Sequence, residues 1–238
     1  MANTYPPVRA EKPGKDADVH GQAWPATASA QASVLAADWR LFALVGLAVA
    51  LLVWALILFA ALRWRRRDGD PLPPQFRRHD ALEITWTVLP LVLVCGLFVY
   101  TYRAEATVES LDATPDLAVA VNGFRWGWSF AYTGGPVITG DANAPPQLVL
   151  PVGRLTRITL TSADVNHAFW VPDFLFKRDA IPGQATQFDL RPTKLGTYLG
   201  HCAEFCGLDH ARMSFSVRVV APDEYARWLR AERIGAYP

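Results

Sequence analysis

The sequence predicts a two-helix transmembrane hairpin, followed by an all-β sandwich domain and a short C-terminal helix. Two long apolar runs precede Arg103. From Asp116 onward, short runs rich in β-branched and aromatic residues are separated by Gly, Pro and Asn, which is typical of a sandwich. With 238 residues, of which 51% are hydrophobic, the chain is long enough for one core of about 100 to 150 residues and a membrane anchor.

The two apolar runs predict membrane-spanning helices. The segments 41–62 and 84–102 contain no charged residue, and each is close to the ~20 residues that cross a bilayer as helix. The connector between them is dense in arginine, and the positive-inside rule therefore places it in the cytoplasm and both termini outside. These arginines are Arg63, Arg65, Arg66, Arg67, Arg77 and Arg78. We expect an outward tail over 1–40, the hairpin over 41–103 and an outward domain over 104–238.

The first apolar run has one alternative interpretation, the hydrophobic part of a cleaved signal peptide. Ala60 and Ala61 provide small residues near its end. The run is long for that purpose, and the arginines and a second span follow it at once, so a hairpin anchor is favoured. The segment 1–40 is rich in Pro, Ala and charge without apolar periodicity, which predicts a loosely ordered tail.

The outward domain contains eight predicted strands and one helix. In the strand over 155–161 the alternation of apolar and polar residues is imperfect and leaves its inner face unassigned. Pro222 precedes a helix over 223–233, which has acidic residues in its first turn and arginines later, as the helix dipole favours. The predicted strands are 117–121, 125–132, 147–150, 155–161, 168–171, 186–190, 196–200 and 214–220.

The segment 200–213 collects most of the soft metal donors of the chain. It holds two of the three cysteines, Cys202 and Cys206, together with His210 and Met213, and His167 lies upstream. Thiolate, thioether and imidazole suit copper, and a weak Met ligand is typical of copper sites that transfer electrons. A blue copper site needs one Cys and two His. The second thiolate therefore predicts two copper ions that share both sulfurs, with one histidine completing each.

Other interpretations of these residues remain open. A disulfide between Cys202 and Cys206 is plausible in an oxidising compartment, although it would close a very short loop. Zinc fits two Cys and two His but leaves Met213 without a role. We expect His201 to point away from Cys202, because neighbours on an extended strand face opposite sides, and Cys95 to be an apolar residue of the second span. The Cys-x-x-Cys-His motif of attached haem is absent from the sequence.

At these residues the chain resembles subunit II of the haem-copper cytochrome c oxidases, from the first span onward. The pattern Cys-x-Glu-x-Cys-x-x-x-His-x-x-Met spans 202–213, and Asp-Val-Asn-His at 164–167 supplies the upstream histidine. The resemblance implies a cupredoxin-like domain with a dinuclear CuA centre. In it, two thiolates bridge, two imidazoles are terminal ligands, a thioether is axial and a backbone carbonyl completes the set. These ligands are Cys202, Cys206, His167, His210, Met213 and the carbonyl of Glu204.

The resemblance implies further functional residues. Trp126, in the aromatic stretch 123–128, corresponds to the tryptophan where electrons enter, and Glu83 marks the mouth of a proton pathway into subunit I. The resemblance also places the Glu204 side chain at a Mg²⁺ site at the border with subunit I, with Asp179 in the network around that ion. Arg125 and Gly127 stand where the family often has glutamine and tyrosine, and the stretch 174–179 resembles bacterial members.

The resemblance implies an oxidase subunit of the bacterial inner membrane, with the CuA domain on the periplasmic side. An external cytochrome c is the expected donor, subunit I (haem and CuB) and subunit III are the expected partners, and this chain itself holds no haem. Electrons would pass to haem for oxygen reduction coupled to proton translocation. We also expect Asp164 and Asp173 to steer a basic cytochrome by their charge. Alternatives are a membrane-anchored copper-delivery protein and a quinol oxidase subunit II, whose best-known members lack the copper ligands.

Overall fold

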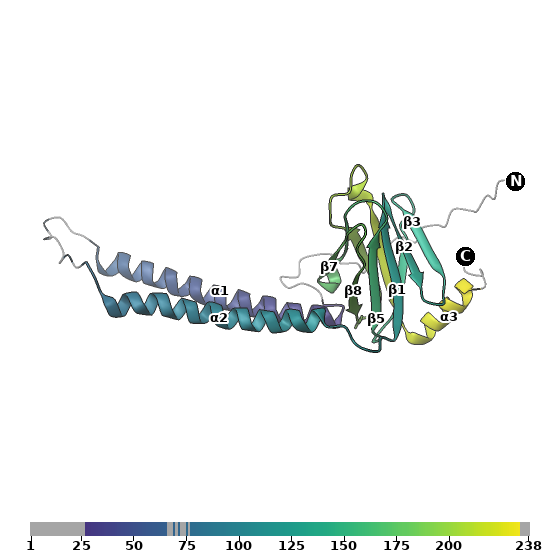
Figure 1. Ribbon diagram of the computed structural model, residues 1–238. Coiled ribbons are helices and arrows are strands. Elements are labelled where there is room, and N and C mark those ends of the chain that lie inside the picture. The colour runs from purple at the N-terminus through teal and green to yellow at the C-terminus, as the bar shows by residue number, and fades with distance from the viewer. Residues whose placement is uncertain (1–26, 66–68, 70, 72–74, 76, 234–238) are drawn as a thin grey trace. The chain divides into compact units, whose positions relative to one another are not determined.

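The computed structural model describes residues 27–65, 69, 71, 75 and 77–233. It forms two compact units: residues 37–107 make one, and the residues on either side of them make the other. The first unit is a pair of long helices, and the second contains two β-sheets and a C-terminal helix (Figure 1). The predicted order of a helical hairpin, a β-sandwich and a short final helix is confirmed.

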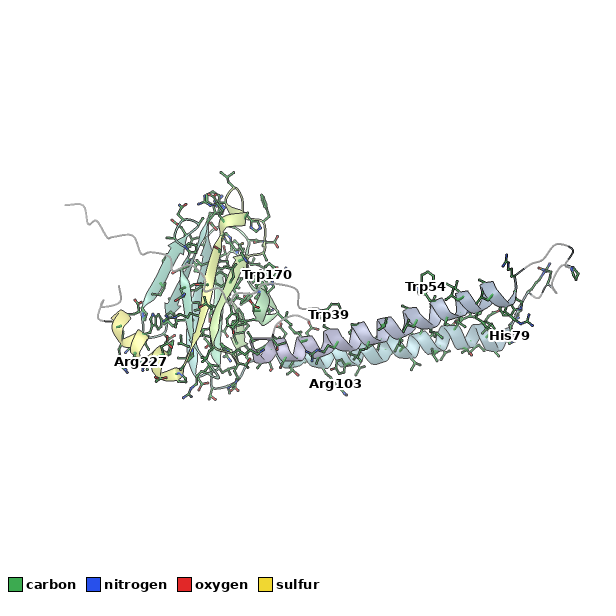
Figure 2. All side chains as sticks on the ribbon, turned by 180° about the vertical axis from the view of Figure 1, so that it is seen from behind. Trp39, Trp54, His79, Arg103, Trp170 and Arg227 are labelled. Atoms are coloured by element: carbon green, nitrogen blue, oxygen red, sulfur yellow. The ribbon has the colours of Figure 1, made fainter. Side chains whose placement is uncertain are left out.

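The hairpin consists of α1 (Ala30–Arg63) and α2 (Asp80–Glu109). Both helices are long and apolar enough to cross a membrane. Their large apolar side chains are exposed, and Trp54, for example, projects from α1 (Figure 2). The hydroxyl of Thr101 donates a hydrogen bond to the carboxylate of Asp38 across the pair, at 3.1 Å. The two predicted spans are therefore helical, while Arg66 and Arg67 of the connector lie outside the described residues.

Both helices extend beyond the apolar runs from which they were predicted. The first helix starts at Ala30 because Ser29 caps it: the Ser29 hydroxyl accepts a hydrogen bond from the backbone N–H of Ala32 at 3.0 Å. Ser29 is buried, and the N–H of Ala28 bonds to the carbonyl of Asp173 at 3.0 Å. The start of α1 is thus fastened to the sandwich, within the segment where a loose tail was expected. Residues 1–26 of that segment lie outside the described part.

The sandwich is built from two five-stranded sheets, with the order β3-β2-β1-β5-β8 in one and β4-β10-β9-β6-β7 in the other. Strand β1 is parallel to β5, and β4 is parallel to β10, while the other pairs are antiparallel. The strands are β1 (Leu117–Phe124), β2 (Gly127–Tyr132), β3 (Val137–Asp141), β4 (Gln147–Pro151), β5 (Thr156–Ser162), β6 (His167–Val171), β7 (Phe176–Ala180), β8 (Thr186–Leu190), β9 (Gly196–Cys202) and β10 (Ser214–Val220).

Aromatic side chains fill the space between the sheets. Trp128 and Phe130 of one sheet meet Phe169 and Phe215 of the other at ring-centroid distances of 5.4 to 6.1 Å. In β5 the alternate residues Thr156, Ile158 and Leu160 are fully buried, which settles the inner face that the sequence left open. The C-terminal helix α3 (Pro222–Arg233) covers one end of this core through buried Tyr225 and Trp228.

Two strands, β3 and β7, were not predicted. Each lies at the edge of its sheet and pairs with one neighbour. Strand β7 carries Lys177, Arg178 and Asp179 in sequence, and β3 is exposed at alternate positions. Charged edge strands discourage pairing between molecules, and they lack the apolar pattern from which strands are predicted.

Candidate metal centre

Strands β6 and β9 and the loop after β9 bring the predicted ligands together. His167 is the first residue of β6, and Cys202 is the last residue of the neighbouring β9. The loop that follows carries Cys206 and a short 3₁₀ helix, η2 (His210–Arg212), and it ends at Met213. The backbone N–H of Cys202 donates to the carbonyl of Met213 at 2.9 Å and closes the base of this loop. The loop therefore folds back so that both of its ends lie beside the two thiols.

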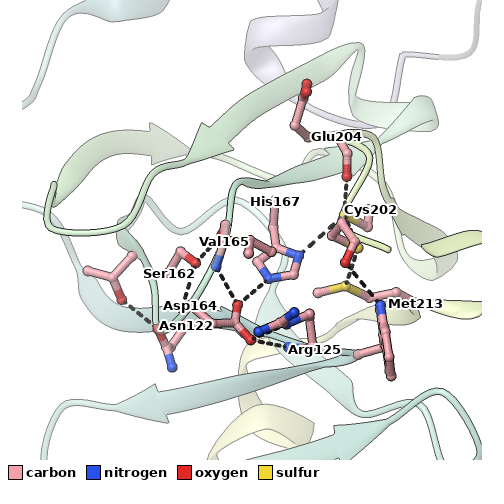
Figure 3. Close-up of polar contacts among 12 residues, drawn as sticks. Asn122, Arg125, Ser162, Asp164, Val165, His167, Cys202, Glu204 and Met213 are labelled. Carbon is pink, nitrogen blue, oxygen red and sulfur yellow. Dashed lines mark hydrogen bonds and ion pairs between the residues drawn. The ribbon is translucent and has the colours of Figure 1, made fainter. Parts of the chain in front are cut away.

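Donor atoms from this loop and from β6 converge around the two thiols (Figure 3). The Sγ atoms of Cys202 and Cys206 lie 3.9 Å apart. The Sγ of Cys202 lies 3.7 Å from Nδ1 of His167 and 3.3 Å from the carbonyl oxygen of Glu204. On the other side, Sγ of Cys206 lies 3.5 Å from Nδ1 of His210 and 3.7 Å from Sδ of Met213. Each thiol thus has its own histidine.

The cluster is shielded from solvent on its inner side. His167 is 0% exposed and Met213 1%, while Cys202 and Cys206 are 6% and 5% exposed. His210 is half-buried and forms the outer rim. A group bound here is therefore surrounded by protein atoms rather than water, except at His210.

The two cysteines are free thiols. Their 3.9 Å separation is nearly twice the ~2.05 Å length of a disulfide bond. The disulfide interpretation is therefore not what the structure shows. The thiols remain available as metal ligands.

The donor set fits copper better than zinc. The ligand atoms of His167, Cys202 and Cys206 lie within 4.8 Å of one another, as a metal site requires. A structural zinc ion takes four ligands in a closed tetrahedron. This site adds a thioether and a backbone carbonyl to two thiols and two imidazoles. A surplus of soft donors around two adjacent sulfurs suits a pair of copper ions.

Asp164 contacts the ring of His167 at the nitrogen that faces away from Cys202. One carboxylate oxygen of Asp164 lies 2.9 Å from Nε2 of His167, on the opposite side of the ring from Cys202. Burial alone would raise the pKa of Asp164, but hydrogen bonds from His167 and from the backbone of Arg125 and Val165 lower it to about 2. Burial opposes the charged form of His167, yet its contacts with Cys202 and Asp164 raise its pKa above the ordinary value.

The two thiols differ in acidity. Burial disfavours the thiolate of Cys202, but hydrogen bonds from the side chain of His167 and from the backbone at Ala168 and Glu204 outweigh it and lower the pKa of Cys202 to about 7. Burial raises the pKa of Cys206, and the negative charge of ionised Cys202 raises it further. In the metal-free protein, Cys202 is therefore the thiol that ionises first. A cation bound between the sulfurs would offset the repulsion that opposes the second ionisation.

Trp126 lies directly against the loop after β9, which carries Cys206. It occupies the turn between β1 and β2, and its indole N–H donates to the carbonyl oxygen of Cys206 at 3.2 Å. Gly207 follows Cys206 with φ +115°, and a Cβ atom built there would lie 3.3 Å from the indole ring. Glycine thus allows the loop to pass against the tryptophan.

The remaining predicted residues add no side chain to the donor contacts described above. Glu83 lies in the first turn of α2, where its carboxylate accepts a hydrogen bond from the backbone N–H of His79 at 3.2 Å. Asp179 is exposed on β7, opposite Ala168 of β6. The side chain of Glu204 points away from Cys202, while its carbonyl faces the thiol (Figure 3). The ring of His201 lies near that of Trp170, at a centroid distance of 6.1 Å and an interplanar angle of 44°.

The expected role of Asp164 and Asp173 as steering charges needs correction. The carboxylate of Asp164 is occupied by Arg125 and His167, and Asp173 is half-buried with its pKa raised by burial. Neither is an isolated surface charge. The sequence analysis did not predict that Arg125 contacts Asp164, which in turn contacts the proposed ligand His167. The three-residue spacing from Asp164 to His167 is visible in the sequence, but the approach of Arg125 depends on strand pairing.

Comparison with known proteins agrees with this geometry. The family model for the periplasmic domain of cytochrome c oxidase subunit II matches residues 141–220. The probable cytochrome c oxidase subunit 2 of Streptomyces coelicolor is 40% identical over 224 residues, which cover 77% of this chain and 70% of the relative. The chain belongs to the cytochrome c oxidase subunit II family. The resemblance stated from the motifs is confirmed.

A second relative and a solved structure from the subunit II family are also similar to this chain. Cytochrome c oxidase subunit 2 of Mycobacterium bovis is 30% identical over 270 residues, covering 88% of this chain and 74% of that protein. Among solved structures, the periplasmic domain of subunit II of cytochrome oxidase from Bradyrhizobium japonicum is 33% identical. It covers 53% of this chain and 100% of that one, with a TM-score of 0.48. As a subunit II family member, this chain combines a membrane-capable hairpin with a β-sandwich that carries a cluster of His167, Cys202 and Cys206 fit for copper.

Proposed function

We propose that this chain is the electron-entry subunit of a haem-copper cytochrome c oxidase. It would accept electrons from cytochrome c at a dinuclear copper centre and pass them to haem in subunit I, where oxygen is reduced with proton translocation. The observation that carries the proposal is the convergence of two free thiols, each with its own imidazole, beside a buried thioether. Family membership supports it.

The proposed ligand set follows the donor distances. Cys202 and Cys206 would hold the copper through their thiolates, His167 and His210 through Nδ1, and Met213 and the carbonyl of Glu204 would complete the ligand set. Copper bound there would supply reversible one-electron chemistry.

The protein contributes rigidity and exclusion of water. His167 is held between Asp164 and Cys202, and the loop is closed by the Cys202–Met213 backbone bond. Buried side chains cannot reorient freely when charge changes, so little reorganisation opposes electron transfer. Trp126 reaches from a half-buried surface position to the carbonyl of Cys206, which makes it the proposed entry point.

Glu83, Glu204 and Asp179 have proposed roles at the border with subunit I. Oxygen ligands suit Mg²⁺, and the Glu204 carboxylate, turned away from the thiols, together with exposed Asp179 would hold it there. Glu83 lies at the start of α2, at the proposed mouth of a proton pathway. Subunit III would complete the assembly.

We propose that the hairpin anchors the chain in the bacterial inner membrane with the connector in the cytoplasm. The domain division would be an outward tail over 1–40, the hairpin over 41–103 and the periplasmic copper domain over 104–238. The two apolar helices and the match to a periplasmic domain support this arrangement.

Metal analysis with electron paramagnetic resonance on the purified full chain tests the proposal. We expect two copper ions per chain and a single shared spin. The variant Cys206→Ser should lose the dinuclear spectrum, because one bridging sulfur is removed. A single-copper signal, bound zinc or an unchanged spectrum in Cys206→Ser would contradict the ligand set. Copper that is released to an acceptor protein, with no haem-bearing partner copurified, would favour a delivery role.

A further inference from the structure

Arg125 and Asp164 form a relay of contacts that ends at His167. One oxygen of Asp164, Oδ2, accepts from the backbone N–H of Arg125 at 2.9 Å and from its guanidinium Nε at 3.3 Å. The other oxygen, Oδ1, accepts from the backbone N–H of Val165 at 2.7 Å and lies 2.9 Å from Nε2 of His167. Figure 3 shows Arg125, Asp164 and His167 in this order. The carboxylate is thus held at both of its oxygens.

We propose that Arg125 is a positioning residue of the metal centre, which acts through Asp164 to fix the His167 ring with Nε2 protonated and Nδ1 free for a metal ion. An ionised carboxylate only accepts hydrogen bonds, so the ring nitrogen that faces it must be the donor. The neutral ring then carries its lone pair on Nδ1, the atom 3.7 Å from Sγ of Cys202. This inference rests on the proposed copper function.

Strand pairing explains why Arg125 can reach Asp164. Residues 125 and 126 form the turn between β1 and β2, since Phe124 pairs with Gly127. The N–H of Ala163 donates to the carbonyl of Gly123 at 2.9 Å, which fixes the segment before His167 beside that turn. The same turn carries Trp126, whose indole bonds to Cys206. Two consecutive residues therefore contact the His167 half and the Cys206 half of the donor set.

The exposure of Arg125 and Asp164 indicates that their ion pair orients His167 rather than stabilises the fold. The side chain of Arg125 is 51% exposed and that of Asp164 25% exposed, and such ion pairs contribute little to folding. His167 is fully buried. The contact therefore transmits a restraint from a solvent-facing arginine to a buried ligand. Carboxylates that orient a ligating histidine typically change metal affinity by about 10- to 100-fold when they are removed.

Arg154 and Asp116 provide a matched control at the opposite end of β1. The guanidinium of Arg154 bonds to Asp116 at 3.0 Å, with side chains 58% and 34% exposed, and Asp116 also accepts a backbone N–H, from Leu155. This pair has the same chemistry as Arg125 and Asp164 but contacts none of the proposed ligands. The variant Arg154→Gln therefore reports the effect of losing an arginine alone.

The experiment compares Arg125→Gln, Arg125→Lys, Asp164→Asn and Arg154→Gln in the full-length chain. The first measurement is ¹⁵N NMR of the His167 ring in copper-free chain at alkaline pH, with the signal assigned by its loss in His167→Gln. We expect one tautomer, protonated at Nε2, in the parent chain and in Arg154→Gln. Arg125→Gln should show a mixture, Asp164→Asn a larger change, and Arg125→Lys the parent signal in most molecules.

The second measurement is competitive copper titration of the same chains. Asp164→Asn should lower the affinity by about 10- to 100-fold, and Arg125→Gln by about 10-fold, because its backbone contact survives. Arg125→Lys should recover most of this loss. If Arg125→Gln matches Arg154→Gln in both tautomer and affinity, the proposal is wrong. If the parent chain binds no copper, the proposed function fails, while the NMR result still decides whether Arg125 positions the ring.

Discussion

The indole nitrogen of Trp126 donates a hydrogen bond to the main-chain carbonyl of Cys206 at 3.2 Å. The two residues are 80 positions apart in the sequence: Trp126 lies in the turn between β1 and β2, and Cys206 lies in the loop after β9. No side chain stands between the tryptophan and the loop at Gly207. A half-buried aromatic ring is thus connected to a proposed thiolate ligand by one hydrogen bond.

Replacement of Trp126 tests this connection. Trp126→Phe keeps an aromatic ring but removes the N–H, and loss of one hydrogen bond costs about 0.5 to 1.5 kcal/mol of stability. We expect slower electron transfer from reduced cytochrome c, measured by stopped flow, with the copper spectrum retained. Trp170→Phe is the control, since Trp170 lies on β6 and its ring is near His201. Equal rates in the parent chain and Trp126→Phe would exclude this route.

Replacement of Gly207 tests the close approach of the loop to Trp126. Alanine at φ +115° is strained by about 1 to 2 kcal/mol, and its Cβ would lie 3.3 Å from the indole ring. We expect Gly207→Ala to lower stability and also to shift the fluorescence of Trp126. Gly153→Ala is the control, because Gly153 has φ +75° and no atom within 4 Å of the added Cβ. If both variants leave the fluorescence unchanged, the loop is not packed against the indole.

The two helices, eight strands and the gathering of donor residues in the loop after β9 were predictable from the sequence, because each has a local signal. Uncharged apolar runs mark the helices, and Cys202, Cys206, His210 and Met213 lie within one loop. Their spacing alone indicates a shared metal site. His167 lies 35 positions before Cys202, and the pairing of β6 with β9 explains why the two residues meet.

Contacts that depend on strand pairing were not predictable. Arg125 reads as a departure from the family pattern, and only the register of β1 with β2 and β5 brings it to Asp164. The edge strand β7 has charged residues where an apolar alternation would be needed. The start of α1 depends on the cap at Ser29 and on contacts with residues more than 140 positions later.

A buried ion pair predicts acid sensitivity of the sandwich. The carboxylate of Asp189 is 3% exposed and accepts from Arg157 at 2.6 and 2.8 Å and from the backbone N–H of Asp112 at 2.7 Å. Burial would raise the pKa of Asp189, but these hydrogen bonds outweigh it and hold the pKa below its ordinary value. The ionised group therefore stabilises the fold above the unfolded-state value of about pH 4. That stabilisation is lost as the pH falls through the lower, folded-state pKa.

Urea unfolding of the full chain in detergent across this pH range checks the prediction. Asp189→Asn should cost about 3 to 5 kcal/mol near neutral pH, because it leaves the partly buried charge of Arg157 without its partner. It should also flatten the pH dependence in acid. Asp223→Asn is the control, since its pair with Arg227 is exposed and contributes little to stability. A parent-like acid slope in Asp189→Asn would show that another group controls the acid response.

Met213 gives a test that separates ligation from packing. Its side chain is 1% exposed, and Sδ lies 3.7 Å from Sγ of Cys206. Leucine conserves the volume, so Met213→Leu should cost less than about 1.5 kcal/mol of stability. It removes the thioether donor, and we therefore expect two copper ions to remain with a shifted reduction potential, measured by spectroelectrochemistry. The reverse exchange Leu190→Met in β8, at a fully buried position outside the proposed ligand set, should leave the potential unchanged. A potential that does not move in Met213→Leu would mean that the thioether only packs against the thiol.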